Sequence, residues 1–456
     1  MRQVDLTLVR KYDVPGPRYT SYPTALQFAE LDESAYARAI ESSPLRDQDI
    51  SLYFHIPFCA TLCFYCACNK IITKKRTHAE SYLRLLYREL ELKAGLLPGR
   101  AVCQLHFGGG TPTFLSDQQI GDLMDEVRRH FRLRDDADGE FSIEIDPRTV
   151  DAARIRALRA AGFNRLSMGV QDFDPAVQKA VNRIQSFEAT RTAIDAARES
   201  GFRSVSVDLI YGLPHQSVAS VDRTLDQVIE LLPDRISIYN YAHLPDRFMP
   251  QTRIRAEDLP APEEKLRILG RCIEKLAHDA GYVYIGMDHF ARPEDELAVA
   301  QREGTLHRNF QGYSTWSDRD LVAFGVSAIS AIGNLYAQNV KPLDAYTRLL
   351  EAGRLPIEKG VLIDADDLIR KAVIMALICN FELDCAAVER RFDINFADYF
   401  ADELARLGGF VDDGLLDLDA GRIRVNEAGR LFIRNICMCF DRHLAPGVSG
   451  RFSRAI

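Results

Sequence analysis

A repeated alternation of strand and helix patterns runs between residues 51 and 239. Short runs rich in β-branched and aromatic residues are separated by longer segments in which apolar residues recur at helical spacing. Six such repeats predict an α/β fold with a parallel sheet, because each helix returns the chain for another parallel strand. The expected strands are Ser51–Ile56, Ala101–Phe107, Phe141–Ile145, Asn164–Gly169, Arg203–Ile210 and Arg235–Tyr239.

The segments between these strands carry recognisable helix signals. Ser116 is a plausible N-cap for a helix that reaches about Phe131. The other expected helices are Thr77–Leu97, Thr149–Ala161, Ser186–Ser200 and Val218–Leu232. Since loops at the carboxyl ends of parallel strands can vary while the sheet stays fixed, we expect a ligand site at that edge.

The regions on either side of the repeats predict additional parts. Residues 1–50 read as an N-terminal extension with a short helix at Leu31–Ile40. Residues 51–360 are expected to form the repeated α/β part with a polar loop extension. From residue 361 to 456 the pattern is helical, with a small hairpin at Gly414–Val425.

Four of the ten cysteines fall within ten residues. Their order is C-x3-C-x2-C-x-C, comprising Cys59, Cys63, Cys66 and Cys68. An even number of cysteines in a chain of 456 residues without an export signal does not indicate a disulfide framework. The clustering instead predicts metal or redox chemistry.

Two kinds of metal centre suit this loop. Three close thiolates favour an iron–sulfur cluster in which one iron keeps an open position. A structural zinc site is the alternative, but such sites usually pair two Cys-x2-Cys knuckles that lie well apart. Cys437 and Cys439 could be offered as the second pair, although cysteines on a helical pattern are more often buried in a core.

Charge and hydropathy exclude several function classes. There are 57 Lys and Arg against 65 Asp and Glu, a formal charge of −8. This balance argues against non-specific nucleic-acid binding. No run of about 18 apolar residues predicts a membrane span, and the N-terminus lacks the apolar run of a signal peptide. We therefore expect a cytoplasmic monomer without membrane or nucleic-acid partners.

Longer strings around these motifs resemble a known family. The cysteine loop after the first strand and Gly108–Thr113 after the second resemble the radical S-adenosylmethionine (SAM) superfamily. Within it, the chain resembles the oxygen-independent coproporphyrinogen III oxidases of bacterial haem synthesis over essentially its whole length. The strings that carry this resemblance are Tyr53–Cys59, Gly108–Thr113, Ser142–Pro147, Leu166–Phe173, Asn240–Pro245 and His307–Tyr313.

The resemblance implies a partial six-stranded (β/α) barrel with N-terminal and C-terminal additions, and it implies the cofactors. Cys59, Cys63 and Cys66 would hold a [4Fe–4S] cluster, and SAM would chelate the fourth iron. Cys68 would stay off the cluster, as a small buried neighbour. It also separates the enzymes from the related haem chaperones, which resemble this family but typically carry an aromatic residue at that position.

Two SAM molecules are implied. The first would meet Tyr53, Gly109, Glu144 and Ile329. Glycines allow the backbone to approach a ligand closely, and a carboxylate can accept hydrogen bonds from ribose hydroxyls. The positions that match the second SAM site are Tyr65, Gly110, Thr111, Gln171, Arg183, Asp208 and Ala242. Tyr65 departs from the phenylalanine expected there.

The implied reaction converts two propionate side chains of coproporphyrinogen III into vinyl groups, giving protoporphyrinogen IX. A 5′-deoxyadenosyl radical from SAM would remove hydrogen from the propionate β-carbon. An electron donor and an electron acceptor are required, and neither is identified by the sequence. The expected catalytic residues are Tyr53, Glu144, Phe310, Gln311 and Ile329.

The tetra-anionic substrate requires local positive charge in an acidic protein. Arg18, Arg292 and Arg308 lie in polar strings and are candidates for pairing with propionates, although surface arginines are the simpler reading of each. A haem chaperone on the same scaffold is the alternative function. A structural zinc protein is a third possibility, which iron and sulfide analysis distinguishes.

Overall fold

The computed structural model describes residues 6–317, 319–419, 421–444, 452 and 454. The chain divides into two compact units. One, here called the sheet unit, comprises residues 28–260 and 318–362. The other, the terminal unit, comprises residues 1–27, 261–317 and 363–456. In the part of the chain that is described, no helix is long and apolar enough to cross a membrane.

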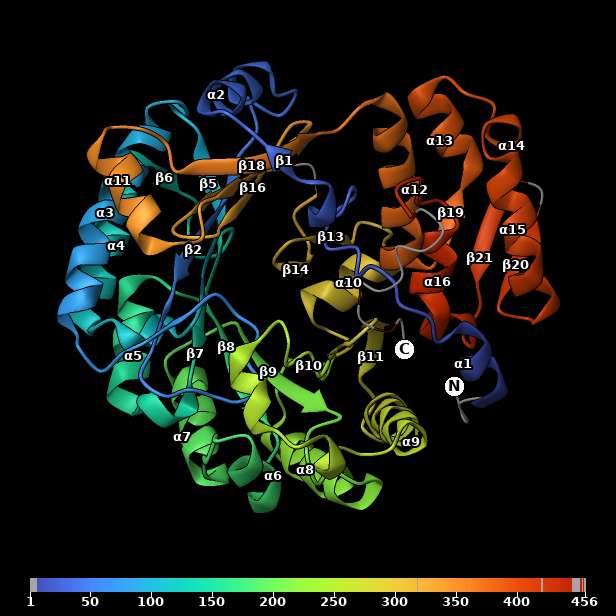
Figure 1. Ribbon diagram of the computed structural model, residues 1–456, viewed down its shortest axis with the longest axis horizontal. Helices are drawn as coiled ribbons and strands as arrows, with labels where there is room; N and C mark the ends of the chain where they lie inside the picture. The colour runs from blue at the N-terminus through green and yellow to red at the C-terminus, as the bar shows by residue number, and fades with distance from the viewer. Residues whose placement is uncertain (1–5, 318, 420, 445–451, 453, 455–456) are drawn as a thin grey trace. The chain divides into compact units, whose positions relative to one another are not determined.

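The sheet unit confirms the six predicted strand–helix repeats (Figure 1). Neighbouring strands pair in parallel in chain order, which is the topology that successive crossovers produce. The strands are β2 (Ile50–Ile56), β5 (Ala101–Gly109), β7 (Glu140–Ile145), β8 (Arg165–Gln171), β9 (Ser204–Tyr211) and β10 (Arg235–Asn240). All six ends that carry the predicted motifs therefore lie along one edge.

The sheet continues beyond the first repeat strand. β15 (Asp320–Phe324) pairs in parallel with β2. An antiparallel series then follows, ending on the short N-terminal strand β1. Its members are β16 (Ile329–Ile332), β17 (Leu335–Asn339), β18 (Ile357–Leu362) and β1 (Ala29–Glu30). The chain thus forms an open sheet, as a partial barrel requires, with strands from both sides of the repeats.

The crossover helices lie along the outer face of the parallel strands (Figure 1). They are α3 (Thr77–Ala94), α4 (Asp117–His130), α5 (Ala152–Ala161), α7 (Phe187–Glu199) and α8 (Val218–Leu231). Ser116 caps α4 as predicted, and its hydroxyl accepts a hydrogen bond from the Gln119 amide at 3.2 Å. α5 starts later than predicted, because residues Pro147–Thr149 form a separate 3-10 turn.

A buried ion pair links α3 to β15. Lys93 Nζ lies 2.6 Å from Glu89 Oε1, and both side chains are fully buried. Lys93 also donates to the Ala323 carbonyl at 2.5 Å, while Glu89 accepts from the Gly325 amide at 2.7 Å and the Tyr346 hydroxyl at 2.5 Å. Because both charges are paired and further hydrogen-bonded, the network holds the helix against the strand end.

The terminal unit is mainly helical and contains the predicted hairpin. Its strands β20 (Leu416–Asp419) and β21 (Arg422–Val425) pair antiparallel, and β19 (Glu382–Asp384) adds a third strand that was not predicted. The helices of seven or more residues are α1 (Leu6–Tyr12), α9 (Pro262–Ile273), α10 (Glu296–Arg302), α12 (Ala365–Asn380), α13 (Cys385–Phe392) and α15 (Ala401–Asp412).

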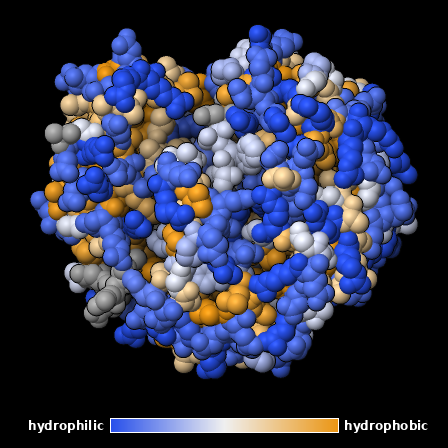
Figure 2. All heavy atoms as spheres, turned by 180° about the vertical axis from the view of Figure 1, so that it is seen from behind, coloured by the Kyte–Doolittle hydropathy of each residue, from blue (hydrophilic) through white to orange (hydrophobic). Residues whose placement is uncertain are grey.

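The terminal unit also contains two short hairpins from the polar stretch. They are β11 (Val283–Gly286) with β12 (His289–Ala291), and β13 (His307–Asn309) with β14 (Gly312–Ser314). The predicted helix at Leu31–Ile40 belongs to the sheet unit as α2 (Glu33–Ser42). On the face shown in Figure 2, hydrophilic side chains predominate and hydrophobic ones form separate patches, as on most globular proteins.

Candidate active site

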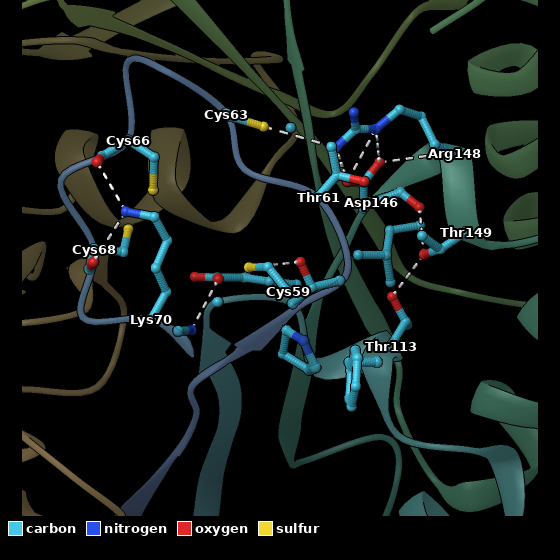
Figure 3. Close-up of a pocket in the computed structure, with 18 of the residues that line it drawn as sticks. Cys59, Thr61, Cys63, Cys66, Cys68, Lys70, Thr113, Asp146, Arg148 and Thr149 are labelled. Atoms are coloured by element: carbon cyan, nitrogen blue, oxygen red, sulfur yellow. Dashed lines mark hydrogen bonds and ion pairs between the residues drawn. The ribbon is translucent and has the colours of Figure 1, made fainter. Parts of the chain in front are cut away.

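The cysteine loop follows the end of β2. It is closed by two short strands, β3 (Phe58–Cys59) and β4 (Ile71–Ile72), which pair in parallel. This closure makes the segment a compact loop, in which the sulfur atoms of Cys59, Cys63 and Cys66 face a common space (Figure 3). All three thiols line a pocket of about 440 Å³, together with Cys68. The predicted ligands are therefore brought together.

Positive charge surrounds two of these thiols. Arg183 Nη1 lies 3.6 Å from Cys63 Sγ, and Arg148 Nη2 lies 3.7 Å from the same sulfur. A hydrogen bond from the Cys68 thiol, together with the Lys70 ammonium, lowers the pKa of Cys66 to about 6. Since the thiolate is the form that ligates metals, these contacts favour metal binding at the loop.

The donor set fits an iron–sulfur cluster. Three thiols from one short loop, with an open pocket in front of them, match a cluster that keeps one iron free for another ligand. Among the residues that the structure describes, no three His, Cys, Asp or Glu side chains converge on a point suited to a single ion. A cluster does not need such convergence, since each thiolate binds a different iron. The neighbouring Cys68 is exposed, contrary to the expectation of a buried residue there.

The glycine turn after β5 presses against the base of this loop. Gly109 has a φ of +118°, a conformation that glycine adopts without steric cost. A Cβ atom on Gly110 would lie 2.8 Å from the Pro57 carbonyl oxygen and 2.9 Å from that of Phe58. Larger residues at either position would thus strain the turn or displace the backbone that leads into Cys59.

Glu144 lies beside the turn at the end of β7. Its Oε2 accepts a hydrogen bond from the Gly109 amide at 3.2 Å, and its Oε1 lies 3.2 Å from His106 Nε2. The ring of His106 stacks on that of Tyr53, with centroids 5.8 Å apart. Glu144 faces the pocket, while Tyr53 is absent from the pocket lining and lies behind the histidine.

The far wall of the pocket is held by a buried arginine. Arg183 Nη2 donates to the Gly169 carbonyl at 2.5 Å, and its Nη1 lies 3.3 Å from Asp146 Oδ2. Arg148 pairs with the same carboxylate at 2.6 Å. Burial opposes ionisation of Asp146, but the hydrogen bond from Arg148 and the charge of Arg183 lower its pKa overall.

Asp208 forms the deepest acidic position of the pocket. Burial, and then the nearby charge of Glu144, raise its pKa to about 7. The Ser167 hydroxyl donates to its Oδ2 at 3.2 Å. Gln171, at the end of β8, has a positive φ of 70° that turns the chain at the pocket wall. A ligand with an amine or hydroxyl donor would meet a carboxyl group here that is half-ionised near neutral pH.

Most of the predicted ligand-binding residues line this one pocket, and a few do not. Those in the lining are Cys59, Cys63, Tyr65, Cys66, Gly109, Gly110, Thr111, Glu144, Gln171, Arg183 and Asp208. Tyr53, Ala242 and Ile329 belong to the sheet unit but are not in the lining. Phe310 and Gln311 belong to the terminal unit, so their part in the site stays a prediction.

Several polar residues of the pocket were missed by the sequence-based prediction. Asp146, Arg148 and Lys70 line it beside the cysteines. Asp146 stands in a string that carried the resemblance, directly after a strand end, which is a usable signal. Arg148 follows two residues later, but its orientation depends on the 3-10 turn at Pro147–Thr149, which no separate sequence pattern indicated.

Comparisons with known proteins agree with this geometry. Residues 53–228 match the family model "Radical SAM superfamily", and residues 363–432 match "HemN C-terminal domain". The chain is 54% identical to the oxygen-independent coproporphyrinogen III oxidase of Pseudomonas aeruginosa, a match that covers 99% of this chain and 98% of the relative. This chain belongs to the oxygen-independent coproporphyrinogen III oxidase family.

Other members of this family show the same extent of similarity. The Escherichia coli relative is 52% identical over 99% of this chain and 98% of its own length. The Synechocystis relative is 45% identical over 98% of this chain and 97% of its own. The solved structure of the E. coli enzyme superposes with a TM-score of 0.92, covering 97% of this chain and 99% of that one. The similarity thus includes both compact units and confirms the predicted fold class.

Proposed function

We infer that this protein converts coproporphyrinogen III to protoporphyrinogen IX without oxygen, by oxidative decarboxylation of two propionate side chains. The observation that carries the inference is the coincidence of a full-length family match with three thiols facing one pocket. The reaction belongs to haem biosynthesis. The names of the relatives, and a cysteine rather than an aromatic residue at Cys68, both favour the enzyme over a haem chaperone on the same scaffold.

The residues of the pocket would divide the cofactors among them. When bound, a reduced [4Fe–4S] cluster on Cys59, Cys63 and Cys66 supplies the electron that cleaves SAM to methionine and a 5′-deoxyadenosyl radical. The glycine turn at Gly109 offers backbone groups to the first SAM molecule. Glu144, held by that turn, is placed to accept hydrogen bonds from ribose hydroxyls.

A second SAM molecule would use the opposite wall. Arg183, fixed by Asp146 and the Gly169 carbonyl, is oriented to clamp a carboxylate. Asp208 is placed to receive an amine or hydroxyl. The other proposed contacts of this molecule are Tyr65, Gly110, Thr111, Gln171 and Ala242. Tyr53, Phe310, Gln311 and Ile329 are proposed to shape the site around the reacting groups.

The proposed activity predicts four linked products. Reconstituted protein, supplied anaerobically with SAM, a chemical reductant and coproporphyrinogen III, should yield protoporphyrinogen IX, CO2, methionine and 5′-deoxyadenosine together. Liquid chromatography with mass detection measures all but the gas, which radiolabelled carboxyl groups report. SAM cleavage that leaves the porphyrinogen unchanged would disprove the substrate assignment.

The structure separates the three arginines that were candidates for binding the substrate. Arg18 forms an ion pair with Asp288, and Arg292 Nε lies 2.8 Å from Glu294 Oε1. Arg308 is 4% exposed, and within the described residues its Nε and Nη1 atoms have no hydrogen-bond partner. Because burying an unpaired guanidinium is costly, we propose that a substrate propionate completes this site.

Substituting Arg308 by glutamine should weaken substrate binding selectively. A charged hydrogen bond is worth roughly 1.5–3 kcal/mol, so the KM for coproporphyrinogen III should rise about 10- to 100-fold. The KM for SAM should stay constant, and thermal unfolding should not shift down, since no native ion pair is lost. Arg292→Gln, at an exposed and already paired side chain, is the control. Equal kinetics of both variants would rule out this role.

A further inference from the structure

The outer side of the cysteine loop is fastened to two neighbouring segments of the sheet unit. The Phe64 amide donates to the Val181 carbonyl at 3.0 Å, and Asn182 Nδ2 donates to the Leu62 carbonyl at 2.7 Å. Gln251 Nε2 donates to the Tyr65 carbonyl at 3.0 Å. The segments around residues 175–184 and 249–258 therefore support the residues that lie between Cys59 and Cys66.

These same segments form a hollow on the surface. It has a volume of about 430 Å³, and its charged or titratable lining residues are Lys179, His215, Arg253, Arg255 and Asp258. Arg255 Nη2 pairs with Asp258 Oδ1 at 2.8 Å, which leaves the charges of Lys179 and Arg253 uncompensated. Among the described residues neither of these two forms an ion pair, so the hollow is positive in a chain whose formal charge is −8.

Apolar side chains accompany this charge. Ile184, in the segment after α6 (Pro175–Ala180), is 71% exposed, and Met249, at the start of the 3-10 turn that ends with Arg253, is 80% exposed. These are the largest exposed fractions among the exposed large hydrophobic side chains of the described residues. Interfaces between proteins commonly combine such methionine and isoleucine contacts with a polar rim.

One side chain connects the surface to the loop. The guanidinium of Arg253 lies over the ring of Phe64, 5.2 Å from its centroid. Phe64 and Tyr65 pack against the buried cluster of Val177, Val181 and Ile254, on the inner side of the hollow. Only Phe64 and Tyr65 stand between Cys63 and Cys66 in the sequence. A protein bound at the hollow would thus lie directly behind two proposed cluster ligands.

We propose that the surface formed by Lys179, Ile184, Met249 and Arg253, here called the carrier surface, docks an acidic protein that carries single electrons. The proposal rests on the proposed function, in which each SAM cleavage consumes one external electron. The carrier is oxidised by one electron and the protein is reduced by one. Charge complementarity selects an acidic partner, and the position behind Phe64 gives a short path to the cysteine loop.

Cross-linking tests the carrier surface without a variant. A flavodoxin, as an acidic one-electron carrier, is mixed with the cluster-loaded protein and a carbodiimide, which joins lysine amines to carboxylates. Peptide mass spectrometry is expected to find Lys179 among the coupled residues. The coupling should fall as ionic strength rises, because exposed charges are screened over about 10 Å at 0.1 M salt. Coupling at other lysines with none at Lys179 would overturn the proposal.

Affinity supplies the second measurement. Lys179→Glu should raise the dissociation constant for flavodoxin about 10-fold, and adding Arg253→Glu should raise it further, because both changes place like charges opposite the partner. Lys341→Glu reverses another exposed lysine that has no ion pair among the described residues, and it should leave the constant unchanged. Wild-type affinity in Lys179→Glu would contradict the carrier surface.

Dithionite separates this proposal from the proposed function. With dithionite as reductant, Lys179→Glu should cleave SAM and convert coproporphyrinogen III at the wild-type rate, which also shows that the variant is folded. Wild-type protein that binds flavodoxin at Lys179 but does not convert the porphyrinogen would refute the proposed function and leave the carrier surface standing. Conversion with dithionite but no flavodoxin binding would do the reverse.

Discussion

Replacing Cys63 by serine should abolish SAM cleavage and porphyrinogen conversion. Cys63 is buried in the pocket with Arg148 and Arg183 against its sulfur, and a serine hydroxyl neither ionises at neutral pH nor ligates iron as a thiolate does. The loss should exceed the roughly 10- to 100-fold that changes to outer partners of a metal site typically cost.

Iron and acid-labile sulfide content, with the electron paramagnetic resonance of the reduced protein, give readouts that do not depend on turnover. Both should fall far below wild type in Cys63→Ser after reconstitution. Cys385→Ser is the matched control, because Cys385 is buried in the terminal unit at the start of α13. A Cys63→Ser protein that keeps full iron content and activity would defeat the assignment of this residue as a ligand.

Replacing Lys93 by methionine should produce the largest loss of stability. The substitution leaves the carboxylate of Glu89 fully buried without its counter-charge, and breaking a buried ion pair on one side costs about 3–5 kcal/mol. Urea denaturation of the purified protein measures the change in the free energy of unfolding.

Two further variants separate the ion pair from simple loss of packing. Lys93→Met combined with Glu89→Leu removes both charges and should recover part of the stability, since apolar replacements of a whole buried pair are often neutral. Arg348→Met breaks an exposed pair with Asp344, and it should cost less than about 1 kcal/mol. A loss in Lys93→Met as small as in Arg348→Met would contradict the role given to the network.

The order of the parallel strands was predictable because it depends on local periodicity. Each strand between Ile50 and Asn240 is a short apolar run, and each is followed by a segment with helical spacing. The place of β15 was not predictable in this way. It pairs with β2, which lies far away in the sequence, and neither strand contains a pattern that specifies the other. Such pairing is decided by tertiary packing.

The candidate site shows the same division. Cys59, Cys63 and Cys66 are close in sequence, so their convergence followed from the loop itself. The partners of the arginines did not, because Arg18 meets Asp288 across the terminal unit while Arg308 meets no carboxylate among the described residues. Sequence alone could not distinguish these two side chains, since pairing depends on residues brought together only by folding.

Isotope transfer tests the central claim most directly. Coproporphyrinogen III that carries deuterium at the β-carbons of its propionates is incubated anaerobically with SAM, reductant and the reconstituted protein. The proposed reaction predicts one deuterium in the 5′-deoxyadenosine formed for each vinyl group that appears. Unlabelled 5′-deoxyadenosine accompanying labelled porphyrinogen product would contradict hydrogen abstraction from that carbon, and with it the proposed chemistry of this site.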